Sequence, residues 1–424
     1  MSGKVFVAEY VLPGHPDKLC DAIADALVEE AGCRERRALC GVEVAVHRAS
    51  VFVTGRIACR NAETIDVTPI VRSVFGGAGY NSTWYPNPSA LKVATDLCLG
   101  PLHEGEAEFR RFADDQSIVT GYAVDLPGTN FLPPEHWLAS RLSRRLERLR
   151  SERPDLLLGP DGKSIVICEE DGNSVRLKAF SASLQQALEG PVVELHRAVL
   201  ELLREELQAA ADAIPGFDSR VPDEVKVNGA GNFAVGGPEG DNGLAGKKLV
   251  VDAYGPRVPI GGGALSGKDF YKADRAGAIL ARRLAKAVAA TAARECTATL
   301  AIMPGQDRFS VVSLVNEEGR RLDASRWMRL FDLSLAGAGD RYTCATPLVD
   351  VARYGHFTDA ARPWEQLGFD PRGASGRTPD SVKANWLVES NSGVCVCRLR
   401  PRKHSGPARL GEGVVPSGKF QGDP

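Results

Sequence analysis

Three glycine-rich stretches of this 424-residue chain combine acidic and basic side chains: GHPDK (14–18), GGPEGDNGLAGKK (236–248) and GGGALSGKD (261–269). Glycine permits tight turns and a close approach of the backbone to a ligand. Each stretch contains lysine, and lysine ammonium groups that lie side by side repel one another unless an anion lies between them. The three stretches together therefore predict a site for a polyanion.

The segment from Gly262 to Lys268 spells G-x-x-x-x-G-K, which resembles a phosphate-binding P-loop, but Asp269 stands where a P-loop has Ser or Thr. In a P-loop that hydroxyl binds Mg²⁺, and the turn lies directly between a strand and a helix. Here the strand predicted at 248–255 ends several residues earlier. The sequence leaves two interpretations open: Lys268 binds phosphate on another kind of loop, or the match is chance.

GHPDK stands immediately before a predicted helix, with Pro16 at or near the first helical position. In the structural interpretation, Asp17 only complements the helix dipole. In the functional interpretation, His15, Asp17 and Lys18 converge at the helix start, where backbone N–H groups favour an anion and a carboxylate can hold Mg²⁺.

Taken together, the stretches supply cations for phosphate and carboxylates for a divalent metal. Mg²⁺ usually keeps several waters and takes one or two carboxylates plus substrate phosphates. The simplest ligand is therefore a magnesium nucleotide. The residues that predict it are the lysines Lys18, Lys247, Lys248, Lys268 and Lys272 and the acids Asp17, Asp241 and Asp274.

The composition is that of an ordinary globular protein, with 43% hydrophobic and 25% charged residues and a net charge of −2. No global basic field favours nucleic acid or an anionic membrane as a partner. The N-terminus has no apolar run typical of a signal peptide. The alanine-rich segment 277–293 contains Arg282, Arg283 and Lys286, which excludes a membrane span. We therefore expect a cytoplasmic protein that binds neither nucleic acid nor a membrane.

Hydrophobic periodicity predicts strands that alternate with amphipathic helices. Hairpins are expected at 40–57 and 164–184, further strands at 248–255 and 310–322, and helices at 17–31, 191–214 and 272–293. This pattern favours an α+β fold with three domains of similar size, in which helices cover one face of each sheet. The expected division is 1–102 (N-terminal domain), 103–114 (mobile lid or linker), 115–233 (central domain), 234–372 (C-terminal domain) and 373–424 (a flexible tail rich in Gly, Pro and Arg).

Several motifs in this order resemble the S-adenosylmethionine synthetase (methionine adenosyltransferase) family, from about Phe6 to Glu365. They are GHPDK with its helix, GGPEGDNGLAGKKLVVDAYG, GGGALSGKD-x-x-K-x-DR, YGHF and PWE. The resemblance implies three structurally related domains, each a mixed β-sheet covered by helices, and a homodimer or tetramer with active sites between subunits. It also implies ATP as substrate with two Mg²⁺ and one K⁺.

In the family reaction, the sulfur of methionine attacks C5′ of ATP, and tripolyphosphate leaves and is cleaved to phosphate and diphosphate. The resemblance implies a role for each matching position in this chain. The implied catalytic residues are His15, Lys163, Lys268 and Lys272. The implied ATP-binding residues are His15, Asp115, Asp161, Lys163, Phe233, Asp241, Lys247, Lys248 and Lys268. The implied metal ligands are Asp17 and Asp274 for Mg²⁺ and Glu43 for K⁺.

The implied acceptor pocket, made by Arg56, Leu99, Asp241 and Lys272, departs from the family pattern at two positions. Arg56 stands where the family has a glutamate that meets the methionine ammonium, and Leu99 falls near a family glutamine. Two cations about 4 Å apart repel by roughly 4 kcal/mol at an effective dielectric of about 20. That energy corresponds to about a thousandfold in affinity.

The sequence therefore predicts an ATP-dependent adenosyltransferase with methionine as its acceptor, and it leaves alternatives. The first is transfer to an acceptor that lacks a free ammonium or carries an extra anionic group, because of Arg56 and Leu99. The second is a non-catalytic nucleotide-binding subunit, and a tripolyphosphatase that uses the cation cluster alone lies between these.

Overall fold

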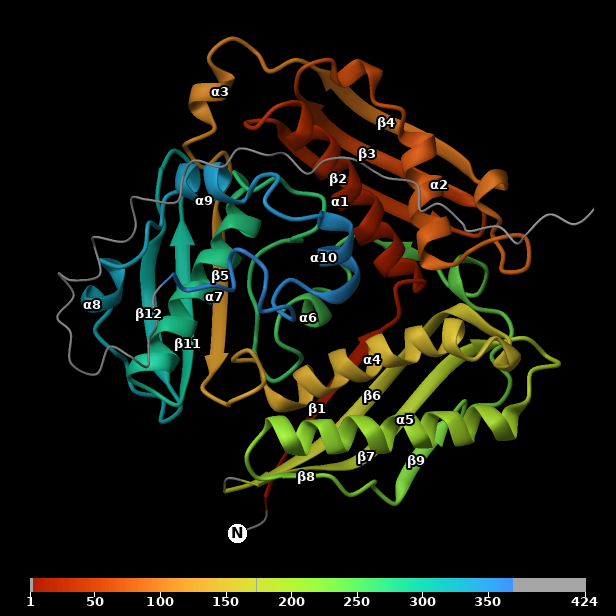
Figure 1. Cartoon of the computed structure of the whole chain (residues 1–424). Coiled ribbons are helices and arrows are strands. Elements are labelled where there is room, and N and C mark those ends of the chain that lie inside the picture. Colours follow the sequence, from red (N-terminus) through yellow and green to blue (C-terminus); the bar gives the residue numbers. More distant parts are fainter. Residues whose placement is uncertain (1–2, 173, 369–424) are drawn as a thin grey trace, which may run out of the picture.

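The computed structural model describes residues 3–172 and 174–368. These residues form three sheets with helices packed against them (Figure 1). In this part of the chain, no helix is long and apolar enough to cross a membrane. Four short 3₁₀ helices lie in the connections: η1 (Ala62–Thr64), η2 (Pro88–Ala90), η3 (Pro154–Leu156) and η4 (Gly237–Glu239).

The first sheet has the strand order β1-β6-β7-β8, with β9 also paired to β7. Strands β1 and β7 are antiparallel to β6, whereas β8 and β9 run parallel to β7, so this sheet is mixed. Two long helices cover one of its faces (Figure 1). The elements are β1 (Lys4–Val11), β6 (Leu158–Asp171), β7 (Ser174–Gln186), β8 (Phe217–Asp218), β9 (Glu224–Val227), α4 (Pro134–Glu152) and α5 (Val192–Ala213).

The second sheet has the order β10-β2-β3-β4, and it is also mixed because β4 runs parallel to β3. Helix α1 packs on its inner face, where the side chains of alternate residues are buried. The elements are β2 (Leu39–His47), β3 (Ser50–Ala58), β4 (Lys92–Gly100), β10 (Gly243–Leu244), α1 (Pro16–Arg34), α2 (Val67–Ala78) and α3 (Glu106–Phe109).

The third sheet has the order β12-β11-β5 and is antiparallel throughout, unlike the mixed sheet that we expected. Helix α7 lies across it so closely that a Cβ atom on Gly121 would come within 2.1 Å of the Ala281 carbonyl. The elements are β5 (Ser117–Val124), β11 (Glu295–Ile302), β12 (Ser310–Asn316), α6 (Leu249–Asp252), α7 (Ala273–Thr291), α8 (Ser325–Met328), α9 (Leu335–Tyr342) and α10 (Leu348–Tyr354).

Each sheet contains one strand from a segment that the sequence assigns to another domain. Strand β1 pairs with β6, β10 pairs with β2, and β5 pairs with β11. The three predicted domains therefore follow one another in the sequence, but each sheet is completed by a strand from another predicted domain. Positions 369–372 and the predicted tail 373–424 lie outside the described residues.

Most of the predicted elements are confirmed: both hairpins, the strand at 310–322 and the three helices. The strand predicted at 248–255 is wrong, because α6 forms a helical turn there. A short apolar run such as LVV does not distinguish a strand from a buried helix by its period. The helical turn directs the Asp252 carboxylate to the buried Lys18 ammonium, and this ion pair favours the helix.

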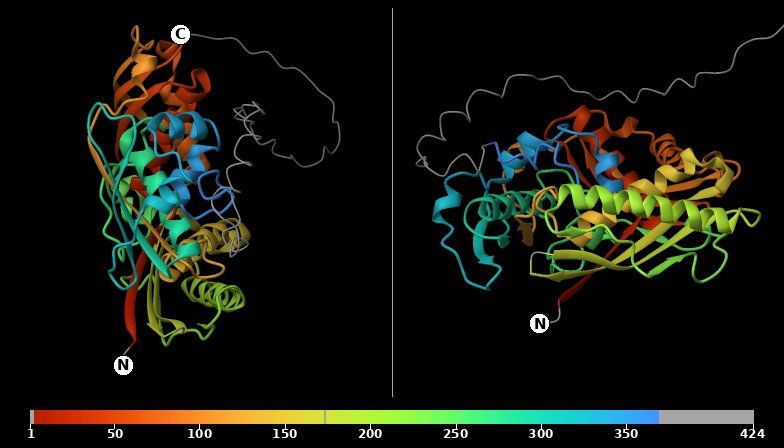
Figure 2. Two further views of the ribbon diagram at one scale, coloured as in Figure 1. Left: turned by 90° about the vertical axis from the view of Figure 1, so that its left-hand side faces the viewer. Right: turned by 60° about the horizontal axis from the view of Figure 1, so that its bottom comes forward.

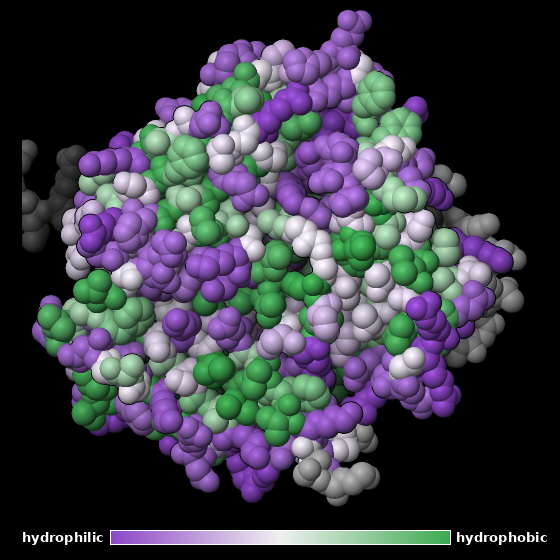
Figure 3. All heavy atoms as spheres, turned by 180° about the vertical axis from the view of Figure 1, so that it is seen from behind, coloured by the Kyte–Doolittle hydropathy of each residue, from purple (hydrophilic) through white to green (hydrophobic). Residues whose placement is uncertain are grey.

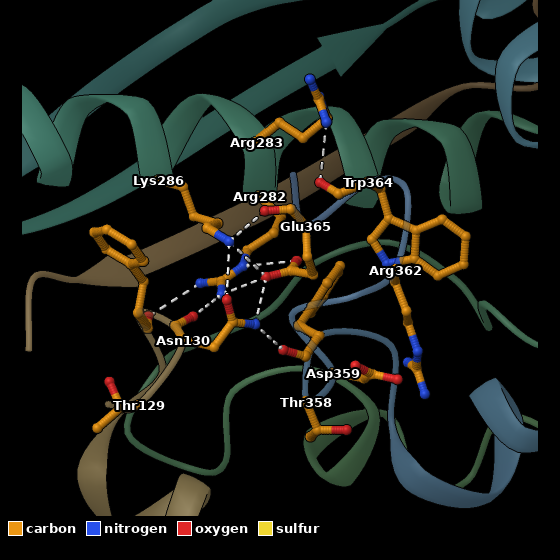
Figure 4. A network of polar contacts seen from close by, with 12 residues as sticks. Thr129, Asn130, Arg282, Arg283, Lys286, Thr358, Asp359, Arg362, Trp364 and Glu365 are labelled. Atoms are coloured by element: carbon orange, nitrogen blue, oxygen red, sulfur yellow. Dashed lines mark hydrogen bonds and ion pairs between the residues drawn. The ribbon is translucent and has the colours of Figure 1, made fainter. Parts of the chain in front are cut away.

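A buried polar network around Glu365 joins α7 to the loop before α4 and to the last described segment (Figure 4). The Glu365 carboxylate pairs with Arg282 at 2.9 Å and Lys286 at 3.0 Å, and it accepts a hydrogen bond from Asn130 at 2.8 Å. Burial opposes ionisation of Glu365, but the two cations hold its pKa below the usual value. A buried charge is tolerated only when it is paired in this way.

Replacement of Glu365 with Ala should destabilise the folded protein, because it leaves the Arg282 and Lys286 charges buried without this carboxylate. We expect a loss of about 3–5 kcal/mol in the free energy of unfolding. Urea denaturation measures this loss. Glu318→Ala, which breaks an exposed pair with Arg320, is the control and should change little. Equal effects of the two substitutions would contradict a stabilising role for the network.

Candidate functional site

Three acids on one face of α1 hold the two glycine-rich loops in place. Asp17, Asp21 and Asp25 are spaced four residues apart, which places them on one side of a helix. The Oδ1 atom of each accepts one backbone N–H: that of Leu244 at 3.0 Å, Gly246 at 2.7 Å and Gly267 at 3.0 Å, respectively. All three acids are buried. We refer to them as the α1 acid row.

Buried cations in the core neutralise the acid row. Asp25 forms a bidentate pair with Arg275 at 2.7 and 2.9 Å. Lys18 is fully buried and pairs with Asp21 at 3.1 Å and with Asp252. The prediction that Lys18 contributes to a polyanion site is therefore wrong, because its ammonium points into the core and is already saturated with carboxylates.

A cavity of about 280 Å³ opens beside the start of α1. It is lined by residues from β6 and β7, by His15 just before α1 and by residues of the segment 228–241. The structure thus brings together five residues that the sequence predicted for one site: His15, Asp161, Lys163, Phe233 and Asp241. The volume is near the lower end for ligand pockets, which span about 300–1,000 Å³.

His15 is the N-cap residue of α1, and its Nδ1 atom accepts the Asp17 backbone N–H at 3.2 Å. This bond fixes the neutral tautomer, in which Nε2 carries the proton. Burial lowers the pKa of His15 to about 4, and the ammonium groups of Lys248 and Lys163 add to this effect, while Asp17 opposes it. His15 is therefore a neutral hydrogen-bond donor at physiological pH.

Two buried carboxylate oxygens, one of Asp17 next to His15 and one of Asp161 in the cavity, lack a hydrogen bond within the described residues. Asp17 Oδ2 lies 3.1 Å from Lys248 Nζ in an ion pair, but within the described ranges it accepts no well-oriented hydrogen bond. Asp17 Oδ1 lies 3.7 Å from Lys247 Nζ. Asp161 Oδ2 accepts the Gly237 N–H at 2.7 Å, whereas its buried Oδ1 has no partner in residues 3–172 and 174–368. Carboxylate oxygens are the ligands that Mg²⁺ prefers, and at Asp17 the ion would take the place of the Lys248 ammonium.

A second cluster gathers the other predicted cationic residues where α7 begins. Lys268 pairs with Asp274, whose other oxygen accepts the Ser117 hydroxyl at 2.6 Å. Burial tends to raise the pKa of Asp274, but the Lys268 ammonium and these hydrogen bonds lower it overall. Lys272 pairs with Asp114. Because Ala273 is the first residue of α7, the two lysines do not share a helix.

The loop at 261–269 is not a P-loop, because Lys268 is followed by a turn and the helix begins at Ala273. Asp269, at the position where a P-loop has a hydroxyl, anchors neighbouring segments instead. Its carboxylate accepts the Cys40 N–H and the Tyr271 N–H, each at 2.8 Å, and pairs with Arg110. The acid therefore fixes the loop that carries Lys268.

The predicted acceptor residues Arg56 and Leu99 lie on opposite faces of the second sheet. The parallel register aligns Arg56 with Cys98 and Ile57 with Leu99. Leu99 packs against the core on the same side as the fully buried Ile57, whereas Arg56 lies on the outer face. The assignment of Leu99 to the pocket of Arg56 is therefore wrong, and the reason is the two-residue period of a strand. Cys98 takes the place beside Arg56.

Two further predicted residues lie at the margins of the second cluster. Glu43 is on the outer face of β2, opposite Thr54; burial raises its pKa, and nearby Lys268 opposes that shift. Asp115 is exposed just before β5, and its side chain accepts the Gln116 N–H at 2.8 Å. Within the described part of the chain, no group of three His, Cys, Asp or Glu side chains could hold a metal ion.

Sequence reasoning missed the residues that position the two clusters. Asp21, Asp25 and Asp269 act through backbone N–H groups, and Asp114 and Ser117 act through side chains. One signal was available: acids at positions i, i+4 and i+8 of a helix form a row that needs partners. The others depend on tertiary contacts that spacing does not reveal.

Comparisons with known proteins agree with this arrangement. Family models described as the N-terminal, central and C-terminal domains of S-adenosylmethionine synthetase match residues 3–97, 110–233 and 235–366. A protein from Petrotoga mobilis named S-adenosylmethionine synthase is 32% identical over 87% of this chain and 97% of its own length. Proteins with the same name from Prochlorococcus marinus and Staphylococcus epidermidis are also 32% identical, over 87% and 86% of this chain and 97% and 96% of theirs.

Replacement of Asp161 with Asn tests the electrostatics of the cavity. Burial raises the pKa of Asp161 to about 6, from a usual value of 3.8. The folded protein therefore keeps a proton that the unfolded chain releases between these values, so its free energy of unfolding falls as pH rises through this window. The variant should escape this loss, which amounts to about 2–3 kcal/mol. Urea denaturation of both proteins at pH 4.5 and 7.5 measures it, and equal pH dependence would contradict the raised pKa.

Proposed function

The chain belongs to the S-adenosylmethionine synthetase family, and from this premise we propose that it is an ATP-dependent adenosyltransferase that forms S-adenosylmethionine from ATP and methionine. The observation that carries the proposal is the α1 acid row. It holds the loop of Lys247 and Lys248 beside Asp17, next to the cavity of His15 and Lys163, and it holds the loop of Lys268 further along the same helix.

The cavity suits the nucleoside end of ATP. Phe233 offers an aromatic face, and the backbone between Gly236 and Gly240 lies close to it. The cationic side chains of Lys163, Lys247 and Lys248 stand on the side of His15 and Asp17, where they suit a triphosphate. Asp25 lies about 12 Å along α1 from Asp17, given a rise of about 1.5 Å per residue, and marks the position of the Lys268 loop.

The chemistry of adenosyl transfer needs the residue types that are present. Negative charge gathers on the leaving tripolyphosphate as the C5′–O bond breaks, so fixed lysines stabilise the transition state more than the ground state. His15, neutral and protonated at Nε2, can donate a hydrogen bond to this group without adding charge. A thioether nucleophile carries no proton, so it needs in-line placement rather than a general base.

Mg²⁺ fits this site, since Asp17 Oδ2 is buried and lacks a well-oriented hydrogen bond within the described ranges. Asp17 and Asp274 would hold the two ions, which supply charge neutralisation at the phosphates. The proposed K⁺ ligand, Glu43, faces Thr54 across the strand pair, and a K⁺ site there needs oxygen ligands from elsewhere.

An acceptor without an ammonium was suggested by Arg56 and Leu99, and the argument from Leu99 is lost because that side chain faces the core. A non-catalytic subunit or a tripolyphosphatase needs only the lysines. The presence of both clusters, one at the cavity of His15 and one at the start of α7, favours the complete transferase.

We also propose that two copies pair through their sheets. The helices cover one side of each sheet, and the opposite side exposes apolar residues on several strands, which Figure 3 shows as patches seen from behind (Figures 1, 2 and 3). One apolar hollow of about 450 Å³ is lined by Phe52, Val93 and Leu244. Exposed apolar patches of this kind mark interaction surfaces. The exposed residues include Val5, Val7, Phe52, Ile118, Ile165, Leu244 and Val312.

Incubation of the purified chain with ATP, Mg²⁺, K⁺ and methionine should yield S-adenosylmethionine, detected by mass spectrometry. Lys268→Ala should lower kcat by about 10²–10³-fold, since it removes a preorganised cation. Lys226→Ala, at an exposed lysine of β9 paired with Glu224, is the matched control and should keep full activity. Nucleotide binding without any adenosyl product, in wild type and variants alike, would support the non-catalytic subunit instead.

Introduction of Asp at Phe52, whose side chain is 44% exposed in the apolar hollow, should prevent pairing of two copies because it buries a charge at the interface. Sedimentation analysis should then find a smaller species than the wild type forms. Val193→Asp on α5, on the helix side, adds the same charge to an exposed apolar position and serves as the control. A wild type that sediments as a monomer would refute the pairing.

A further inference from the structure

Arg56 is paired with an acid from the predicted lid. Its Nη1 and Nη2 atoms donate to the two carboxylate oxygens of Glu106 at 2.7 and 2.8 Å, in a bidentate pair. Glu106 Oε2 also accepts the His103 N–H at 2.9 Å. The guanidinium holds the pKa of Glu106 below its usual value, although partial burial opposes this shift. Glu106 is thus a fixed carboxylate.

This ion pair lies beside the lysine cluster. Arg56 stands opposite Gly41 in the register of β2 and β3, so both positions point to the outer face of the sheet. Gly41 forms a β-bridge with Lys268, and a Cβ atom at Gly41 would lie 3.8 Å from Lys272 Cε. Arg56 and Lys272 therefore flank the space that Gly41 leaves open.

The segment that carries Glu106 is tied to the same cluster by two other ion pairs. Arg110 pairs with Asp269, and Asp114 pairs with Lys272. The segment 103–114 thus lies over the start of α7 and presents Glu106 to the outer face of the second sheet. Its position depends on the loop that carries the phosphate-binding lysine of the proposed reaction.

Both partners of the pair keep hydrogen-bonding capacity. An arginine has five N–H donors, and in the described ranges only two of those of Arg56 are used. A carboxylate has about four lone-pair sites, and three of those of Glu106 are used. The Arg56 side chain remains 35% exposed, so a ligand can reach it.

Resting on the proposed function, we propose that Glu106 and Arg56 together recognise the head group of the acceptor as a zwitterionic α-amino acid. The acceptor ammonium binds the free lone pair of Glu106. The acceptor carboxylate binds the outer N–H groups of Arg56, on the side that faces Lys272. The Glu106 carboxylate then offsets the repulsion between Arg56 and the acceptor ammonium, because it lies one hydrogen bond away from the Arg56 guanidinium. Glu106 supplies the carboxylate that the Arg56 position lacks.

Steady-state kinetics on the full chain tests Glu106. Glu106→Gln should raise KM for methionine by roughly ten- to hundredfold, because it weakens one charge-assisted hydrogen bond. The inhibition constant of 4-(methylthio)butanoate, which is methionine without its ammonium, should stay unchanged, and so should KM for ATP. Glu108→Gln removes an exposed charge from the same helix α3 and is the control. A loss of affinity for both thioethers alike, or for neither, would overturn the proposal.

Arg56→Gln provides the opposite readout. It should weaken the binding of methionine and 4-(methylthio)butanoate while sparing that of 3-(methylthio)propylamine, which has the ammonium and no carboxylate. Equal weakening of the acid and the amine would mean that Arg56 only positions the lid, and would overturn the proposal. A wild type that binds ATP but forms no adenosyl product with methionine refutes the proposed function itself. A productive wild type with an unaffected Glu106→Gln variant refutes only this inference.

Discussion

The α1 acid row is the constraint on which the site depends. Asp17, Asp21 and Asp25 each accept one backbone N–H from a glycine-rich loop that would otherwise be free to move. The acids are buried, and a buried carboxylate is costly unless it is bonded. The backbone N–H groups of the loops donate hydrogen bonds to the acids, and these bonds fix the position of the loops. Glycine is needed at the contact points: at Gly243 a Cβ atom would lie 2.3 Å from the Pro16 carbonyl oxygen, and the positive φ of Gly267 suits no other residue as well.

The row in turn depends on the core beneath it. Arg275 on α7 binds Asp25, and Lys18 on α1 binds Asp252 on α6. The first pair links a helix of the second sheet to the helix that covers the third, and the second pair links the same helix to α6. Because breaking a buried ion pair costs far more than breaking an exposed one, the relative position of the two lysine-bearing loops is set by the core rather than by the loops themselves. This arrangement gives the preorganisation that charge stabilisation in a transition state requires.

The sequence revealed the residues of the site better than their arrangement. The types and spacing of His15 and Lys268 predicted them for phosphate chemistry, whereas Lys163 was implied only by the family resemblance. Sequence reasoning missed Asp269 and Glu106, whose roles depend on contacts between distant segments. It misplaced Leu99 because a shift of one residue moves a side chain to the other face of a strand. It also took 248–255 for a strand, since a short apolar run fits either type of element until the ion pair with Lys18 is known. The major helices and hairpins were predictable because their periodicity is long and regular.

Several predicted phosphate-binding lysines are paired with a carboxylate of the chain: Lys248 with Asp17, Lys268 with Asp274, and Lys272 with Asp114. A bare polyanion would have to displace these acids and leave them without partners, which is costly where they are buried. A magnesium nucleotide carries both signs, so its phosphates can take the lysines while its metal takes the acids. The same pairs that close the site to a simple anion therefore match a ligand in which cation and anion arrive together. This is a physical reason for acids and lysines to alternate in the motifs, and it favours a metal-nucleotide over free phosphate as the ligand for which the site is built.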